Sequence, residues 1–266
     1  MQITLKESFS IKGIGVHTGT HSKMTVLPAE PDAGIIFRCD GVNIPALVEN
    51  VKDTTHGVTL SNGTKEVKTC EHILSALYGL GVDNAIIEIE GKEIPALDGS
   101  SLPITELIKT SPHVANERTI KLKECIFLGN SDASIFAVPS EEFKIAFIID
   151  YPYPGISTQY KCLSITQETY REQIAGARTY AFMEWIDELQ EKGLIRGGSL
   201  KNAVVIGADG PLNSLRYEDE QVRHKILDLI GDLSLLGVRF KGQVFAIKSG
   251  HTLNIEFVRR ILRLGG

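Results

Sequence analysis

The sequence has no long hydrophobic run, which argues against one class of membrane protein. Its most apolar stretches, Ala85-Ile86-Ile87 and Phe147-Ile148-Ile149, are only as long as strands. A helix that crosses a bilayer needs roughly 18 or more apolar residues. The N-terminal residues Met1 to Lys6 show no basic segment followed by an apolar core, so we expect no secretory signal. We therefore expect a cytoplasmic protein without a membrane-spanning segment.

Cysteine is scarce, and charge is nearly balanced. The four cysteines are widely spaced and form no Cys-x-x-Cys pair, which argues against a disulfide framework and against a zinc site built from thiolates. The chain carries 28 basic and 33 acidic residues, for a net charge of −5, without runs of Lys or Arg. Because a protein that follows a nucleic-acid backbone needs basic patches, we expect no nucleic-acid partner.

The length and one aperiodic segment predict two domains. A chain of 266 residues exceeds the usual size of one simple domain. Residues 110–118 lack hydrophobic periodicity and contain a Ser-Pro pair, which is typical of a loop. We therefore predict an N-terminal domain over 1–112 and a C-terminal domain over 113–266.

Both halves end in the same order of elements. Each shows a helical pattern, a short apolar strand and a second helix, with a Leu-Gly-Val turn before the strand. We expect these elements at 70–80, 84–90 and 100–109 in the first half, and at 220–236, 243–248 and 252–262 in the second. The fold class predicted is α+β, with two similar domains, each a small, mainly antiparallel sheet with helices on one face.

The long helix expected over 220–236 combines an apolar stripe with acidic residues. Its apolar residues recur at helical spacing, and His224, Asp228 and Asp232 lie at i, i+4 and i+8 on one face. Burying two carboxylates is costly unless they meet cationic or metal partners. An imidazole one turn from a carboxylate can hold a divalent metal. A His–Asp pair on a partly exposed side explains the same spacing, so spacing alone leaves both interpretations open.

Thr69-Cys70-Glu71-His72 begins the helix expected over 70–80. Thr69 can cap this helix, and the helix dipole favours Glu71 in its first turn. His72 has no such explanation, although a core histidine is the commoner outcome. If His72 joins His224 and Asp228, the three form the donor set of a catalytic zinc site, and Glu71 can act as a base beside it. The usual His-Glu-x-x-His pattern is absent.

Ser249-Gly250-His251-Thr252 brings a histidine to the start of the last helix. A helix N-terminus lowers the pKa of an imidazole, which opposes a role as general acid. A nearby carboxylate such as Asp232 would raise that pKa again. A polar residue that caps the helix is the alternative.

Taken together, these motifs resemble the UDP-3-O-acyl-N-acetylglucosamine deacetylase family, zinc amidases that act in lipid A biosynthesis. The resemblance covers nearly the whole chain. Its carriers, in family order, are Gly13-Ile14-Gly15-Val16-His17-Thr18-Gly19, Thr69 to Leu74, Glu93 to Ser100, Ala177-Arg178-Thr179-Tyr180, Gly197 to Asn202, Leu215 to Glu220, Val222 to Asp232 and Ser249 to Asn254.

The resemblance implies a role for each matching residue. His72, His224 and Asp228 would hold Zn²⁺, and Glu71 would be the general base. His251 would be the general acid, oriented by Asp232. Thr179 would help to hold the oxyanion, and Lys225 would line the sugar–phosphate region.

The resemblance also implies an architecture and a substrate. The two domains would pack helix to helix with the active site between them, and an insert at about 194–217 would form a passage for an acyl chain. Phe182, Ile186, Gly198 and Lys201 are the candidate substrate contacts, although Phe182 and Ile186 could equally be core residues. We expect a monomer whose partner is a small molecule, an acylated UDP-sugar. A zinc amidohydrolase of another acylated nucleotide sugar and a non-catalytic nucleotide-sugar-binding relative are the alternatives.

Overall fold

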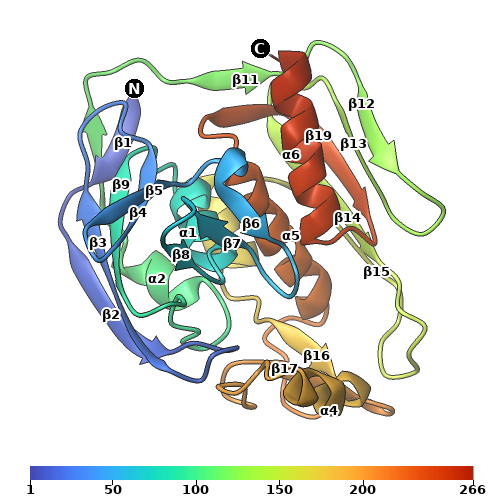
Figure 1. Cartoon of the computed structure of the whole chain (residues 1–266). Coiled ribbons are helices and arrows are strands. Elements are labelled where there is room, and N and C mark those ends of the chain that lie inside the picture. The colour runs from blue at the N-terminus through green and yellow to red at the C-terminus, as the bar shows by residue number, and fades with distance from the viewer. Residues whose placement is uncertain (266) are drawn as a thin grey trace.

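The computed structural model describes residues 1–265 and shows two sheets on either side of central helices (Figure 1). The helices are α1 (Glu71–Gly79), α2 (Leu102–Leu107), α3 (Gln167–Thr169), α4 (Met183–Glu191), α5 (Glu220–Ser234) and α6 (His251–Gly265). A 3-10 turn covers Val48–Asn50, and a π-helical turn at Tyr170–Ile174 continues α3. The mixture of helices and mainly antiparallel sheets confirms the α+β fold class.

The two large sheets share one topology. The first has the order β2 (Phe9–Ile14), β3 (His21–Pro28), β9 (Ala85–Glu90), β4 (Ile35–Cys39) and β5 (Val42–Pro45). The second has the order β12 (Ile126–Gly129), β13 (Ser134–Val138), β19 (Arg239–Ile247), β14 (Phe143–Ile149) and β15 (Gln159–Ser164). In each sheet the central strand, β9 or β19, is antiparallel to one hairpin and parallel to the other. The two halves are thus two copies of one arrangement.

Two further strand pairings and two small sheets complete the strands. β1 (Gln2–Leu5) pairs with β10 (Thr110–His113), and β11 (Thr119–Lys121) runs parallel to β19. A three-stranded sheet of β6 (Val51–Asp53), β7 (Thr59–Ser61) and β8 (Glu66–Val67) precedes α1. Another of β16 (Tyr180–Phe182), β17 (Val204–Gly207) and β18 (Gly210–Pro211) precedes α5 and lies with α4 at the bottom of Figure 1. Each half therefore carries its insert at the same place, between its second hairpin and its central helix.

The structure differs from the sequence expectations in two places. Residues 110–118, expected to be a loop, contain β10, because Thr110 to His113 pair with β1 at the start of the chain. The unit around the insert expected at about 194–217 is larger: it also includes β16 and α4, since Tyr180 to Phe182 run parallel to Val204 to Ile206. Neither pairing could be inferred from local periodicity, because the partner strands are distant in sequence.

A continuous apolar core joins both sheets to the central helices. It includes Phe37 and Ile87 of the first sheet, Ile145 of the second, Leu74 of α1 and Ile230 of α5, each no more than 1% exposed. Within α5, Lys225 and Ser234 are the residues that are not fully buried. Since α5 is covered on every side, its polar residues must find partners inside the protein.

Helices α1 and α5 touch at their backbones. A Cβ atom placed on Gly231 of α5 would lie 2.3 Å from the carbonyl oxygen of Glu71, far inside van der Waals contact. A glycine at this position therefore permits the approach that places the first turn of α1 against the middle of α5.

In the part of the chain that the structure covers, residues 1–265, none of the helices has both the length and the hydropathy needed to cross a bilayer.

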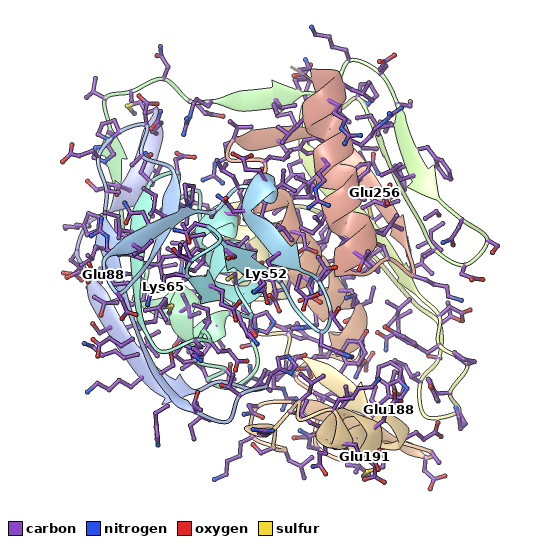
Figure 2. The ribbon with its side chains drawn as sticks, in the orientation of Figure 1. Lys52, Lys65, Glu88, Glu188, Glu191 and Glu256 are labelled. Carbon is purple, nitrogen blue, oxygen red and sulfur yellow. The ribbon has the colours of Figure 1, made fainter. Side chains whose placement is uncertain are left out.

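We predict that Gly231→Ala destabilises the protein by about 1–3 kcal/mol, because the new methyl group would collide with the α1 backbone. In an unpacked helix the same change stabilises by roughly 1 kcal/mol, so the sign of the effect is diagnostic. Urea denaturation measures the change in the free energy of unfolding. The control is Glu256→Ala on the exposed face of α6 (Figure 2), expected to stay within about 0.5 kcal/mol of the wild type. An unchanged or raised stability of Gly231→Ala would contradict the tight crossing.

Candidate active site

The start of α1 presents Glu71 and His72 to α5. Thr69 precedes the helix with a φ of +58°, and its hydroxyl donates to Glu93 at 3.0 Å. Cys70 is the residue at the N-cap position, and no side chain caps the helix, so the expected cap at Thr69 is wrong. Thr69 instead forms a left-handed turn anchored by Glu93, from which α1 begins directly with Glu71.

Helix α5 brings its polar residues to the same place. Asp228 Oδ1 lies 3.3 Å from Nε2 of His224 and 3.8 Å from Nε2 of His72, whose two rings meet edge to face with centroids 5.0 Å apart. Asp228 Oδ2 accepts from Lys225 Nζ at 3.0 Å. His224 and Asp228 are only 3% and 4% exposed. Two imidazoles and a carboxylate from different halves of the chain therefore converge in a buried site.

The segment before α5 fixes the His224 ring. His224 Nδ1 lies 3.0 Å from the carbonyl oxygen of Ala177. Because a carbonyl can only accept, Nδ1 carries the proton, and the lone pair of Nε2 points toward Asp228. The next residue, Arg178, forms a buried two-pronged ion pair with Glu220 at the start of α5, at 2.8 and 3.0 Å. Thr179, the residue after Arg178, lies in the wall of the site, where its backbone bonds to Gly99 and Val204.

The charge states of this cluster suit a divalent cation. Burial and the neighbouring His224 lower the pKa of His72 to about 3, and burial lowers the pKa of His224. Burial opposes ionisation of Asp228, but the charged Lys225 and His251 outweigh it and hold the pKa of this carboxyl below its usual value. Ligand atoms of His72, His224 and Asp228 all lie within 4.8 Å of one another. Two neutral imidazoles and one carboxylate are the donor set of a catalytic metal centre with an open position.

Glu71 lies beside this cluster and is 4% exposed. Its Oε2 accepts from the backbone N–H of Val58 at 2.8 Å, and Gly57, with a φ of +137°, leaves room for Oε1. Burial, reinforced by Asp228, raises the pKa of Glu71 to about 7, although His251 opposes the shift. A carboxyl with this pKa can accept and release a proton near neutral pH.

His251, the first residue of α6, faces the cluster from the other side. Its Nδ1 lies 2.9 and 3.0 Å from the two oxygens of Asp232, which is fully buried on α5. Burial would lower the pKa of His251, but Asp232 outweighs it and raises that pKa to about 9. The ring is therefore charged at neutral pH, with Nε2 turned toward Asp228, 4.0 Å away.

Sequence reasoning assigned no role to Asn254, which completes this arrangement. Its Nδ2 donates to Asp232 Oδ2 at 2.8 Å, and its Oδ1 accepts from the Ser249 hydroxyl. Asn254 is three residues after His251 on α6, so helical spacing places both side chains on one face. That spacing was the signal that could have identified it.

A cavity of about 530 Å³ extends from the cluster into the insert. Thr179, Lys225, Ile186 and Gly198 line it. Apolar side chains from the insert form much of its wall: Met183, Trp185, Leu189, Ile195, Leu200, Val205 and Leu212. The apolar face of α4 thus meets the cavity, while Glu188 and Glu191 of the same helix lie at the surface (Figure 2).

Two of the candidate substrate contacts lie elsewhere. Phe182 is 2% exposed, belongs to a small core with Val204 and Ile206, and stacks on Tyr153 at 4.3 Å. It is a core residue of the insert, which was the alternative reading of the sequence. Lys201 is exposed and lies outside the cavity wall.

Five aromatic residues of the wall were not predicted: His17, His56, Tyr151, Tyr180 and Trp185. His17 and Tyr180 belong to motifs that carry the family resemblance, which could have drawn attention to them. His56 and Tyr151 follow strands in loops, where periodicity carries no information about orientation.

Comparison with known proteins shows the family of the chain. The family model described as UDP-3-O-acyl N-acetylglycosamine deacetylase matches residues 2–263. Proteins named UDP-3-O-acyl-N-acetylglucosamine deacetylase from Syntrophotalea carbinolica and Chlamydia pneumoniae are 43% and 42% identical to the chain. Both alignments cover 98% of this chain, and they cover 87% and 96% of the relatives, respectively. The chain therefore belongs to the UDP-3-O-acyl N-acetylglycosamine deacetylase family.

Proposed function

We propose that this chain is a zinc-dependent hydrolase that removes the N-acetyl group of UDP-3-O-acyl-N-acetylglucosamine and releases acetate, a step of lipid A biosynthesis. The observation that carries the proposal is the convergence of two neutral imidazoles, one carboxylate, Glu71 and a charged His251 at the end of an apolar cavity. Metal-dependent amide hydrolysis with a general base and a general acid uses all of these groups, whereas a protein that only binds nucleotide sugars needs neither the base nor the acid.

His72, His224 and Asp228 are the residues that would hold Zn²⁺. When bound, this ion would lower the pKa of a coordinated water toward ~7 and polarise the acetamide carbonyl. The fixed tautomer of His224 and the ionised Asp228 prepare the ligand atoms without a proton having to leave.

Glu71 and His251 divide the proton transfers between them. Glu71, held by the Val58 N–H, takes a proton from the water that attacks the carbonyl carbon. An amide nitrogen leaves poorly as an anion, so His251 donates its Nε2 proton to the departing amine. Asp232 keeps the ring charged and oriented because it accepts from Nδ1. The Thr179 hydroxyl is the donor we assign to the oxyanion.

The cavity accounts for the rest of the substrate. Its apolar wall in the insert fits the 3-O-acyl chain, whose burial is favourable by about 0.8 kcal/mol per CH₂. Lys225, bonded to Asp228 in the metal cluster, suits the sugar–phosphate part. Ile186 and Gly198 line the acyl passage in this proposal, while Phe182 and Lys201 do not contact the substrate.

The proposed site draws on both proposed domains. The first, 1–112, supplies Glu71 and His72, and the second, 113–266, supplies the other groups. Because one chain holds them all, a monomer suffices. We also propose a cytoplasmic location, because the cysteines are all free, which suits a reducing compartment.

Acetate release tests the proposed function. We expect the purified protein to release acetate from UDP-3-O-acyl-N-acetylglucosamine, to lose this activity on exhaustive chelation, and to regain it when Zn²⁺ is added back. Activity that survives chelation would contradict the metal mechanism. Activity on other acylated nucleotide sugars alone would identify a different amidohydrolase, and binding without acetate release would identify a non-catalytic relative.

The pH profile of kcat/KM tests the two proton carriers. As the pH increases, activity should rise when Glu71 loses its proton and fall when His251 loses its proton. The profile should therefore be bell-shaped, with its two limbs set by pKa values of about 7 and about 9. A bound cation stabilises the deprotonated form of both groups, so both limbs should lie at lower pH in the metal-loaded enzyme. His251→Ala should remove the alkaline limb and lower kcat by roughly 10²–10⁴-fold. The control is His21→Ala, at an exposed histidine of β3.

Asp232→Asn removes the charge of Asp232 but keeps the size of its side chain, and so tests whether this charge raises the pKa of His251. Asn still accepts a hydrogen bond from His251 Nδ1 but carries no charge, so the pKa of His251 should fall and the alkaline limb should move to lower pH. The midpoint of that limb is the quantity to measure. An alkaline limb that stays in place would rule out Asp232 as the group that raises the pKa of His251.

A further inference from the structure

The second large sheet has one face against the helices and one face open to solvent. Helix α5 packs against β14 and β15, and α6 packs against β12 and β13 (Figure 1). Inward residues of these strands, such as Ile135 and Val244, belong to the core. Successive side chains of a strand point to opposite faces, so the residues between them point outward. Among these, Phe127 and Tyr160 are 64% and 61% exposed, so this face holds aromatic side chains in water.

The strand register arranges the outward residues in rows that cross the sheet from β12 to β15. The first row is Phe127, Phe136, Phe245, Ala146 and Cys162. The second row is Gly129, Ser134, Ile247, Ile148 and Tyr160. In the first row the rings of Phe136 and Phe245 stack with their centroids 4.6 Å apart. These two rows, which we call the aromatic patch, contain no charged residue.

The first sheet shows that the shared topology does not require such a patch. Two neighbouring outward rows of that sheet are polar: Ser10, Thr25, Glu88, Arg38 and Asn43, and Lys12, Lys23 and Glu90. Arg38 and Glu88 form an ion pair at 3.2 Å. Lys23 and Glu90 form another at 2.5 Å. Rows of this kind are satisfied by water and by each other, whereas a contiguous apolar area on the surface marks an interaction site.

The charges around the aromatic patch favour a protein surface over an anionic membrane as its partner. A bilayer with anionic lipids attracts clusters of Lys and Arg. The exposed residues that flank the strands have both signs instead: Lys123, Glu124, Asp132 and Lys248. In the neighbouring outward row, Lys144 Nζ lies 3.2 Å from Glu142. A charge-balanced rim around an uncharged centre suits a second surface of the same composition.

A second copy of the sheet matches the first row by size. A turn of 180° about an axis through Phe245 and parallel to the strands reverses the strand order, so β12 of one copy faces β15 of the other. Phe127 then lies over Cys162. Phe136 lies over Ala146, and Phe245 meets its own copy on the axis. Each bulky side chain beside the axis thus faces a small one.

The second row matches in the opposite sense. Under the same rotation, Tyr160 lies over Gly129. Ile148 lies over Ser134, and Ile247 meets its own copy. The large residues of the first row are on the β12 side, and those of the second row are on the β15 side. The aromatic patch is therefore complementary to its own copy across the width of the sheet.

The outer face is large enough for a dimer. Five strands about 4.8 Å apart, each presenting a stretch of about 17 Å, cover roughly 400 Å² of a flat plane. Two such faces would remove about 800 Å² from water, and the protruding side chains of Phe127 and Tyr160 each add about 100 Å² or more. The total exceeds the ~1,000 Å² that a specific interface needs.

We propose that this chain forms a two-fold symmetric dimer in which the aromatic patches of two copies pack face to face. This arrangement is the ordinary packing of two sheets, about 10 Å apart with their strands rotated by about 30°. It covers the apolar face by an isologous contact, the commonest type in soluble homo-oligomers. The residues that line the cavity lie outside the aromatic patch. Pairing is therefore separate from the proposed chemistry, for which one chain suffices.

Sedimentation equilibrium of the full-length protein measures the pairing. The wild type should have twice the mass of one chain and should dissociate on dilution, with a Kd in the micromolar range or below. Phe127→Glu should raise the Kd by about 10²–10⁴-fold, because each dimer loses two buried aromatic side chains and gains two charges. Its free energy of unfolding and its acetate release per chain should stay at wild-type values. Ser10→Glu, at the exposed end of a polar row in the first sheet, is the matched control and should leave the Kd unchanged.

A charge pair tests the register of the two copies. Cys162→Lys alone should weaken the dimer. Combined with Phe127→Glu, it places an ammonium opposite each new carboxylate, and two such pairs form per dimer. The double variant should therefore dimerise at least about tenfold more tightly than Phe127→Glu. Cys162→Lys combined with Ser10→Glu should gain nothing over Cys162→Lys.

A wild-type protein that remains monomeric at about 100 µM, far above the expected Kd, would overturn the proposal. So would a dimer that Phe127→Glu leaves intact, or a double variant that dimerises no more tightly than Phe127→Glu. Flotation with vesicles of phosphatidylethanolamine and phosphatidylglycerol addresses the membrane. The proposed dimer should not bind these vesicles. A monomer that binds them, and that loses this binding in Phe127→Glu, would assign the aromatic patch to lipid instead.

Discussion

The backbone contact between α1 and α5 is the constraint on which the rest of the structure depends. Gly231 allows α5 to touch the backbone of Glu71, and the same crossing brings His72 within 3.8 Å of Asp228. Neither half holds a complete donor set by itself. Burying Asp228 and Asp232 along a fully covered helix would be costly alone, but Lys225, His251 and Asn254 supply them with hydrogen-bond donors. The contact between α1 and α5 thus assembles the site, and the hydrogen bonds within the site help to stabilise that contact.

The repeated topology explains how one crossing can build an asymmetric site. Both halves place a sheet of two hairpins around a central strand, and both insert a small sheet just before the central helix. The first insert supplies the Val58 N–H that holds Glu71, and its loop brings His56 to the cavity. The second insert supplies the apolar wall. The two inserts occupy equivalent positions in the two halves but contribute differently to the common cavity: the first supplies polar groups, and the second supplies apolar side chains.

The sequence predicted the parts of the site that depend on local spacing. Helical periodicity placed His224, Asp228 and Asp232 on one face, and the Gly turn placed His251 at a helix start, as the structure has them. The fold class was also correct. What periodicity could not give were pairings between distant segments: β10 with β1, β16 with β17, and the anchoring of Thr69 by Glu93. Whether Phe182 or Ile186 faces the cavity is likewise decided by how the insert packs, since both positions are apolar.

X-ray absorption at the zinc edge shows whether residues from two helices form one metal centre. For the zinc-loaded protein we expect one Zn²⁺ per chain, with scattering from two imidazoles, carboxylate or water oxygens at about 2.0–2.2 Å, and no sulfur. His224→Ala should lose the contribution of one imidazole. A sulfur shell, or a spectrum that His224→Ala leaves unchanged, would contradict the account.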